Sequence, residues 1–119
     1  MKKLFLTICL TAMLSTPAIA ACEGGTEVEG FCISSIDLNW WSAANWCKAN
    51  GMRLATTYEV CPDWDSNRGE SKCRTFSYSE RIWTATANGD QSATAVDPWR
   101  GYVHFNGRVE AYRAACTNS

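Results

Sequence analysis

The stretch that decides the fold is NWWSAANWCKANGMRLATTYE, residues 39–59. Asn39 is a favourable N-cap for a helix, and Gly51 stands where the residue after a helix adopts a positive φ. Apolar side chains fall on one face of that helix at i, i+3 and i+7 spacing: Trp40, Ala43 and Cys47. The pattern therefore predicts a helix over residues 40–50.

The end of the same stretch predicts a second helix. Thr56 and Glu59 fit a capping box, in which each side chain bonds the backbone N–H of the other residue. The helix would open at Thr57. Pro62 has no N–H to donate to the carbonyl of Tyr58, so we expect this helix to be short or deformed.

Strand signals lie on both sides of the helices. Residues 22–38 carry glycines around two cysteines and indicate a small N-terminal hairpin, with a strand over residues 28–36. Asn106-Gly107 separates two alternating runs and predicts a type I′ hairpin turn. Further strands are expected over residues 82–86, 101–105, 108–112 and 113–116, and loops over residues 62–80 and 87–100. Two helices followed by a late antiparallel sheet make an α+β domain.

In this order and spacing, residues 28–116 resemble the C-type lectin-like family. Its first helix carries Trp-x-x-Ala-x-x-x-Cys, and a Gly, a Leu-containing strand, a Ser- or Thr-capped helix with a Glu, a strand Trp and a closing Cys follow. The matching residues are Trp40, Ala43, Cys47, Gly51, Leu54, Thr56, Glu59, Trp83 and Cys116. The sequence of residues 51–56 is also similar to that of bacterial members of the family and of the related formylglycine-generating enzymes. The resemblance implies a C-type lectin-like fold and a binding function.

The chain departs from the calcium-dependent, sugar-binding branch of that family. The branch uses a Glu-Pro-Asn or Gln-Pro-Asp tripeptide and a later Trp-Asn-Asp, and neither occurs here. Asp97-Pro98-Trp99 keeps one carboxylate before a proline and lacks the second side chain. The resemblance therefore implies binding that does not depend on calcium.

Residues 1–20 have the features of a secretory signal peptide. Lys2 and Lys3 precede an apolar stretch too short to span a membrane, and residues 18–20 form an Ala-x-Ala ending. We therefore predict a secreted or periplasmic protein with one mature domain over residues 21–119. The chain has a net charge of −1, and removing the two lysines makes it more acidic. No basic run remains, so nucleic acid is not an expected partner.

The cysteines favour soluble export over lipid attachment. Residues 19–22 also fit a lipoprotein signal, which would place a lipid on Cys22 and leave an odd number of other exported cysteines. Of the seven cysteines, Cys9 lies in the signal, and the rest are Cys22, Cys32, Cys47, Cys61, Cys73 and Cys116. An even set in an exported chain indicates disulfides, although lipidation of Cys22 stays open.

The pairing follows from neighbourhood and from the resemblance. Two pairs are nearest neighbours that flank loops, and the third ties the first helix to the last strand, as in the family. The predicted pairs are Cys22–Cys32, Cys61–Cys73 and Cys47–Cys116.

Residues 84–101 are the predicted ligand-binding region, because in the resembled family the segment before the terminal hairpin tends to face the ligand. Its side chains offer hydrogen-bonding groups, charges and one flat ring. The predicted ligand-binding residues are Asn88, Asp90, Gln91, Asp97, Trp99 and Arg100. The alternative, that they merely solvate a loop, stays open. We expect Trp40, Trp46 and Trp83 in the core and Trp64 capping it, while Trp99 fits either role.

Metal binding and catalysis are not predicted. Asp63, Asp65 and Asn67 alternate as in a calcium loop, but arginines stand where such a loop needs Gly and a bidentate Glu, so calcium binding by residues 63–69 stays open. His104 shares a polar strand face with Tyr102 and Asn106, and no nucleophile motif or Cys-x-x-Cys pair accompanies it.

Two functions remain, and neither requires a cofactor or an enzyme activity. One is a binding module for a glycan or a protein ligand. The other is a structural or inhibitory protein that uses a protein–protein interface. The sequence leaves the ligand and the oligomeric state undetermined.

Overall fold

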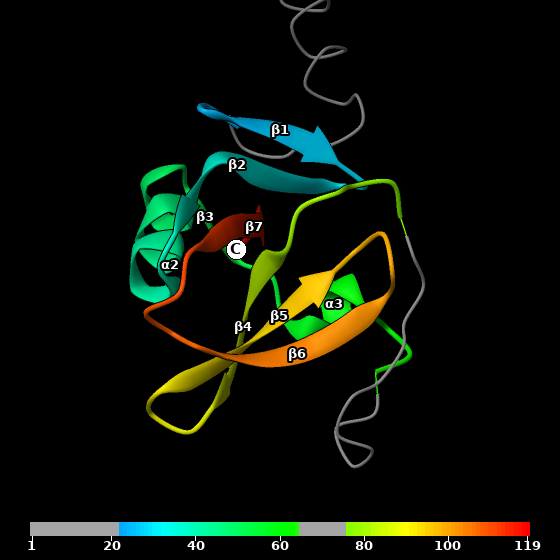
Figure 1. Ribbon diagram of the computed structural model, residues 1–119. Coiled ribbons are helices and arrows are strands. Elements are labelled where there is room, and N and C mark those ends of the chain that lie inside the picture. Colours follow the sequence, from blue (N-terminus) through cyan, green and yellow to red (C-terminus); the bar gives the residue numbers. More distant parts are fainter. Residues whose placement is uncertain (1–21, 65–75) are drawn as a thin grey trace, which may run out of the picture.

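The part of the chain that the structure describes forms seven strands and two helices. The computed structural model describes residues 22–64 and 76–119 (Figure 1). In chain order the elements are β1 (Gly25–Val28), β2 (Phe31–Leu38), α2 (Trp40–Ala49), β3 (Met52–Leu54), α3 (Thr57–Val60), β4 (Ile82–Asn88), β5 (Ser92–Asp97), β6 (Tyr102–Gly107) and β7 (Tyr112–Asn118). This mixture of helices and one sheet is the predicted α+β class.

Strand β7 is the centre of the sheet. The strand order is β1-β2-β7-β4-β5-β6, and β3 also pairs with β7. Strand β2 is antiparallel to β7, β4 is parallel to it at residues 113–114, and β3 is antiparallel to it at residues 116–118. The sheet is therefore mixed and begins before the helices. The prediction of a late, antiparallel sheet was wrong because the N-terminal hairpin joins β7 and because β4 runs in the same direction as β7.

The predicted N-terminal hairpin is present, but its turn falls inside the segment predicted as one strand. Residues 28–36 do not form one strand, because Glu29 and Gly30 make a turn with φ of 52° and 85° between β1 and β2. The strands predicted over residues 82–86 and 113–116 are present as β4 and β7.

Asn106-Gly107 does not form the predicted hairpin turn. Both residues lie in β6 and pair with the start of β5. The turn that joins β5 to β6 covers residues 98–101 instead, where the N–H of Gly101 donates to the carbonyl of Asp97 at 2.7 Å. Gly101 has a φ of 69°, which suits a glycine. Pairing along β5 thus overrides the local turn preference of Asn-Gly.

The predicted loop over residues 87–100 contains a strand. Residues 92–97 form β5, which lies between β4 and β6, and five of its six residues are buried. The segment is rich in Ala, Ser and Asp, which have little intrinsic strand preference. Its conformation is set by pairing on both edges, and local composition does not report that pairing.

Each face of the sheet is covered by its own apolar cluster. Helix α2 covers one face, where its buried residues Ala43 and Cys47 join Trp83 and Cys116. Helix α3 covers the other face. Residues packed there include Val60, Trp64, Ile82, Val96 and Val103. Trp83 and Trp64 are therefore core residues, as predicted, and Trp40 and Trp46 are partly buried against the α2 side.

The predicted ends of α2 are confirmed. The side chain of Asn39 accepts a hydrogen bond from the N–H of Ser42 at 2.9 Å. At the other end, Gly51 has a φ of 74° and its N–H donates to the carbonyl of Lys48 at 3.0 Å. Both caps satisfy backbone groups that the helix itself leaves unpaired.

Helix α3 is a single turn opened by the predicted capping box. The Thr56 hydroxyl accepts from the N–H of Glu59 at 3.2 Å, and Glu59 Oε1 accepts from the N–H of Thr56 at 2.8 Å. Glu59 also accepts two hydrogen bonds of 2.8 Å from the guanidinium of Arg53. The carboxylate of Glu59 therefore caps α3 and also fixes the side chain of Arg53 on β3.

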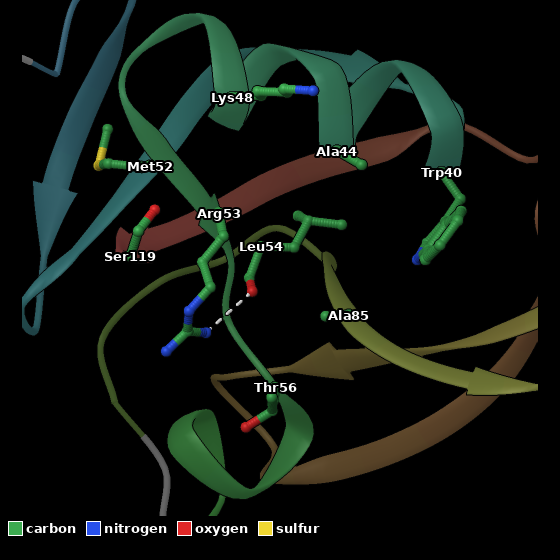
Figure 2. A pocket seen from close by; sticks show the side chains of 9 residues that line it. All are labelled: Trp40, Ala44, Lys48, Met52, Arg53, Leu54, Thr56, Ala85 and Ser119. Atoms are coloured by element: carbon green, nitrogen blue, oxygen red, sulfur yellow. Dashed lines mark hydrogen bonds between the residues drawn. The ribbon is translucent and has the colours of Figure 1, made fainter.

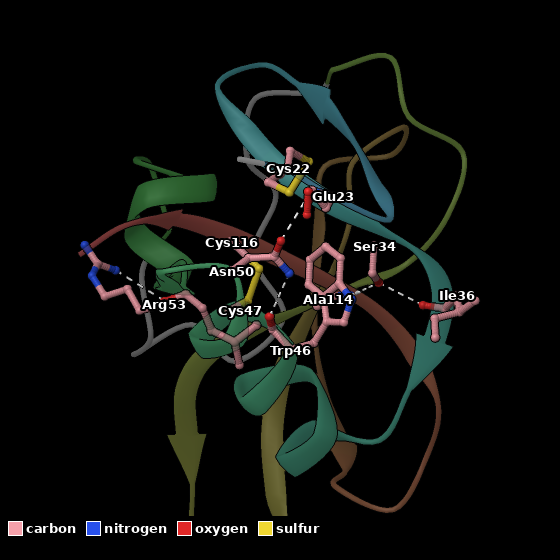
Figure 3. The surroundings of a disulfide bond; sticks show 12 residues. Cys22, Glu23, Ser34, Ile36, Trp46, Cys47, Asn50, Arg53, Ala114 and Cys116 are labelled. Carbon is pink, nitrogen blue, oxygen red and sulfur yellow. Dashed lines mark hydrogen bonds between the residues drawn. A yellow bond between two sulfur atoms is a disulfide. The ribbon is translucent and has the colours of Figure 1, made fainter. Parts of the chain in front are cut away.

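Two of the predicted disulfides are confirmed. Cys22–Cys32 joins the segment before β1 to β2, and Cys47–Cys116 joins α2 to β7 (Figure 3). Cys61 is also disulfide-bonded, but its predicted partner, Cys73, lies outside the described residues. The first bond thus ties the start of the described chain to the N-terminal hairpin, and the second fastens α2 to the central strand of the sheet.

Removing the disulfide between α2 and β7 should destabilise the protein more than removing the N-terminal one. Cys47 and Cys116 are 69 residues apart, whereas Cys22 and Cys32 are 10 apart. The chain-entropy relation gives about 4 kcal/mol for the longer loop and about 3 kcal/mol for the shorter one. Paired Cys→Ala variants unfolded in guanidinium should show this order. The reverse order would mean that local packing, and not loop closure, sets the contribution.

Glu59→Gln should lower stability at neutral pH and lose its effect in acid. The hydrogen bonds of Arg53, opposed in part by burial, hold the pKa of Glu59 at about 2 against an ordinary 4.5. A lowered pKa gives stability that is present above pH 4.5 and disappears as the pH falls to about 2. Because both side chains are more than a third exposed, we expect a loss of at most about 1 kcal/mol. Gln can still cap α3, so the difference isolates the charge. Urea unfolding at pH 7 and pH 2 checks it, and equal losses at both pH values would contradict it.

Candidate functional site

One predicted site residue, Asp97, is a fully buried carboxylate at the end of β5. Arg81 donates to it twice, from Nε to Oδ1 at 2.6 Å and from a terminal nitrogen to Oδ2 at 3.1 Å. His104 Nε2 lies 2.9 Å from Oδ2. A buried charge costs much free energy unless it is paired, and Arg81 and His104 provide that pairing.

The electrostatics of Asp97 are those of a structural ion pair. Burial alone would raise the pKa of Asp97, because desolvation penalises the charged form. The hydrogen bonds and charge of Arg81, with a contribution from His104, outweigh burial and hold the pKa of Asp97 below its usual value. The carboxylate therefore stays ionised and fully engaged at neutral pH, which leaves little of it for a ligand.

The six predicted ligand-binding residues do not lie together. One group is at the β4 end and in the β4–β5 turn: Asn88, Asp90 and Gln91. The other group is at the β5 end and in the β5–β6 turn: Asp97, Trp99 and Arg100. Strand β5 separates the two groups by roughly 17 Å at the usual rise per residue. No continuous loop surface joins them.

Two members of the second group, Trp99 and Arg100, are exposed in the β5–β6 turn. Trp99 is 44% exposed. The guanidinium of Arg100 lies 4.7 Å from the ring centroid of Tyr102, and the ring of Tyr102 meets that of His104 edge-on. This turn presents the ring of Trp99 and the cation of Arg100 to solvent, and contact between that ring and a ligand stays a prediction.

Near the first group, a cation links two tryptophans to the β4–β5 turn. The guanidinium of Arg108 lies 4.4 Å from the ring centroid of Trp40 and 6.0 Å from that of Trp41. It donates to the carbonyls of Gly89 at 2.6 Å and Ser92 at 3.1 Å. Arg108 therefore fixes the start of α2 against this turn and supports the position of Trp40.

A groove that the sequence did not predict opens between α2, β3, β4 and the start of α3. It has a volume of about 610 Å³, within the range of small-ligand sites (Figure 2). Its lining residues are Trp40, Ala44, Lys48, Met52, Arg53, Leu54, Thr56, Ala85 and Ser119. Most of these side chains are apolar or small, and the two cations lie on α2 and β3.

Two polar side chains along the groove, Trp40 and Arg53, are already paired. The indole Nε1 of Trp40 donates to the carbonyl of Thr84 at 2.9 Å, which fixes the ring at one end of the groove. Arg53 donates to the carbonyl of Leu54 at 3.2 Å besides its ion pair with Glu59. Lys48 is exposed and makes no ion pair with any residue that the structure describes. The groove thus combines apolar walls with one available cation.

A signal for this groove is present in the sequence. Trp40, Ala44 and Lys48 follow one another at i+4 spacing, so they line a single stripe of the helix. The stripe was not interpreted as a groove wall, because the resemblance to the family led us to expect Trp40 in the core. The opposite wall, Ala85, comes from β4 and could not be joined to the stripe without the fold.

The structure offers no further support for a metal site or a membrane helix. Within residues 22–64 and 76–119 no group of three or more His, Cys, Asp or Glu side chains is placed to hold a metal ion. Asp65 and Asn67 of the considered calcium loop lie outside those ranges. Among the helices described, none has the length and hydropathy needed to cross a membrane.

Comparison with protein-family models, curated proteins and solved structures finds no match for this chain.

Arg81→Met should destabilise the protein strongly, because it leaves the carboxylate of Asp97 buried without its main partner. Breaking a buried pair in this way costs about 3–5 kcal/mol. Arg100→Met is the matched control, since Arg100 is exposed and its Nε lies 3.9 Å from Asp97. Unfolding in urea at pH 7 should show a small loss for the control and a partial recovery in Arg81→Met/Asp97→Asn. Equal losses for the two arginine variants would contradict the assignment.

Proposed function

We propose that this chain is an exported, non-catalytic binding module with a C-type lectin-like fold, and that it recognises a protein ligand through the groove beside α2. The order of elements supports the family proposal: the helix bearing Cys47 is tied to the last strand at Cys116, and Trp83 is buried on a neighbouring strand. The signal-like N-terminus and the disulfides support export.

The groove is the observation that carries the proposed function. It is the kind of concave, mainly apolar site in which ligands are bound, and its polar groups are arranged before any ligand arrives. Leu54 and Ala85 give it a surface that suits the apolar side chains of a protein. Sugar sites need many hydrogen-bonding side chains, and this groove provides few of them. A structural or inhibitory role would use the same protein–protein contact.

A glycan is the second candidate ligand, and a different surface favours it. Trp99 is 44% exposed in the β5–β6 turn, next to Arg100 and Tyr102. A flat ring with a cation and a phenol beside it can stack on a sugar and bond its hydroxyls. The two candidates therefore predict different residues.

Ala44→Trp and Trp99→Ala should separate the two ligand classes. The purified mature protein would be screened against a displayed random-peptide library and a glycan array, both in chelator. We expect selected peptides to lose binding to Ala44→Trp, because the larger side chain fills the groove, and to keep binding to Trp99→Ala. Sugar hits that disappear in Trp99→Ala and persist in Ala44→Trp would favour the glycan instead. Absence of any binder in both screens would contradict the binding function.

A further inference from the structure

Strand β3 has one edge paired and one edge facing the groove. Its residues pair in the order Met52–Asn118, Arg53–Thr117 and Leu54–Cys116. In the same register, the N–H of Ala55 donates to the carbonyl of Ala115 at 2.9 Å. In antiparallel strands, hydrogen-bonded and non-hydrogen-bonded pairs alternate. The pair at Arg53 is therefore hydrogen-bonded, and the pairs at its two neighbours are not.

The backbone groups of Met52 and Leu54 consequently point away from β7. The N–H and C=O of these residues lie on the side of β3 that lines the groove. The carbonyl of Leu54 accepts from the side chain of Arg53, which agrees with this direction. Because β7 pairs with the other edge of β3, the outer N–H groups of these residues can bond an added backbone.

The groove has the form of a fork between two strands. At its closed end, the N–H of Ala85 on β4 donates to the carbonyl of Ala55 at 2.7 Å. Beyond that bond β3 and β4 separate, and the groove lies between them beneath α2 (Figure 2). An extended chain that enters the fork would lie beside the outer edge of β3. Ala44 on α2 and Ala85 on β4 leave space for its side chains.

The charge of Lys48 favours a bound segment that carries an acidic residue. Lys48 stands over the groove with no ion-pair partner among the described residues, and Arg53 keeps a net neutral pair with Glu59. An acidic residue in the bound segment would pair with Lys48.

We infer that the groove takes an extended peptide segment as an added strand on β3, with apolar residues and one acidic residue on the face turned to α2. This inference rests on the proposed function and specifies its ligand. Backbone hydrogen bonds to Met52 and Leu54 hold the segment, apolar side chains fill the space beside Trp40, Ala44 and Ala85, and a carboxylate meets Lys48. Adding a strand to a free edge is a general mode of peptide recognition.

The test uses a synthetic fluorescent peptide, acetyl-Thr-Val-Thr-Phe-Thr-Glu-amide, and the purified mature protein. Val, Phe and Glu share one face of this strand. Two further versions each carry one backbone N-methyl group, at the Phe or at the Thr before it. The N–H groups of adjacent residues in a strand point to opposite sides. We expect one methylation to weaken binding at least about tenfold and the other to change it less than about threefold, because a lost backbone bond with an unpaired partner costs about 1–3 kcal/mol. Slower hydrogen exchange at the amide of Leu54 on binding is expected as well.

Two charge-changing variants test the role of the cation. Lys48→Glu should weaken the acidic peptide roughly fivefold, the size expected for an exposed ion pair. It should strengthen the version with Lys in place of Glu. Asn45→Glu, which is also on α2 but outside the groove lining, is the control and should change neither. Both positions are exposed, so the comparison holds even where Ala44→Trp fails to fold.

The outcomes distinguish the inference from the proposed function. Binding that Ala44→Trp abolishes, but that both methylations weaken equally, would overturn strand addition and leave a groove-binding protein. Binding that ignores Ala44→Trp and Lys48→Glu alike would overturn both. A position-dependent methylation effect, together with the reversed preference of Lys48→Glu, supports the inference.

Discussion

One edge of β7 is divided between two strands, and much of the structure follows from this division. Strand β4 uses the first part of the edge, at residues 113–114, and runs parallel to β7. Strand β3 uses the last part, at residues 116–118, and runs antiparallel to it. Two strands on the same edge must meet and then separate. They meet at Ala55 and Ala85, and their separation makes the groove. The groove is therefore a consequence of the way in which β3 and β4 share one edge of β7.

The elements around the fork are held by contacts from distant parts of the chain. Cys47–Cys116 fixes α2 above β7, and Trp40 reaches from α2 to the carbonyl of Thr84. Beneath the fork, the register of β4 shifts between Trp83 and Ala87. There the buried hydroxyls bond one another, which pairs polar groups that a bulge would otherwise leave unsatisfied: Thr57, Thr84 and Thr94. The irregular part of β4 is thus stabilised from the side opposite α2.

Signals that act within a few residues were readable from the sequence, and pairings between distant residues were not. Asn39, Gly51 and the Thr56 capping box act through bonds to their near neighbours, so both ends of α2 and the start of α3 were predicted correctly. Asn106-Gly107 failed as a turn because β5 pairs with it, and that strand was itself hidden in a segment of small and polar residues.

The same reason explains the outcome at the candidate sites. Asp97 was taken for a loop residue, yet Arg81 and His104 bury and pair it at the end of a strand. The α2 wall of the groove could have been found as a stripe at i+4 spacing. Its other wall depends on how β3 and β4 divide one edge of β7. Periodicity describes one element at a time, so it could not bring these walls together.

The two charged regions differ in what a ligand could gain from them. At Asp97, the cations and the carboxylate already satisfy one another, and a ligand would have to break those bonds before making its own. At the groove, the indole of Trp40 and the guanidinium of Arg53 are also engaged, but with neighbouring carbonyls and Glu59, outside the apolar space. An apolar group can enter that space without stripping a polar group of its partner, so the desolvation cost of binding is low there. The buried ion pair and the groove use different residues, so the free energy of the ion pair does not oppose binding in the groove.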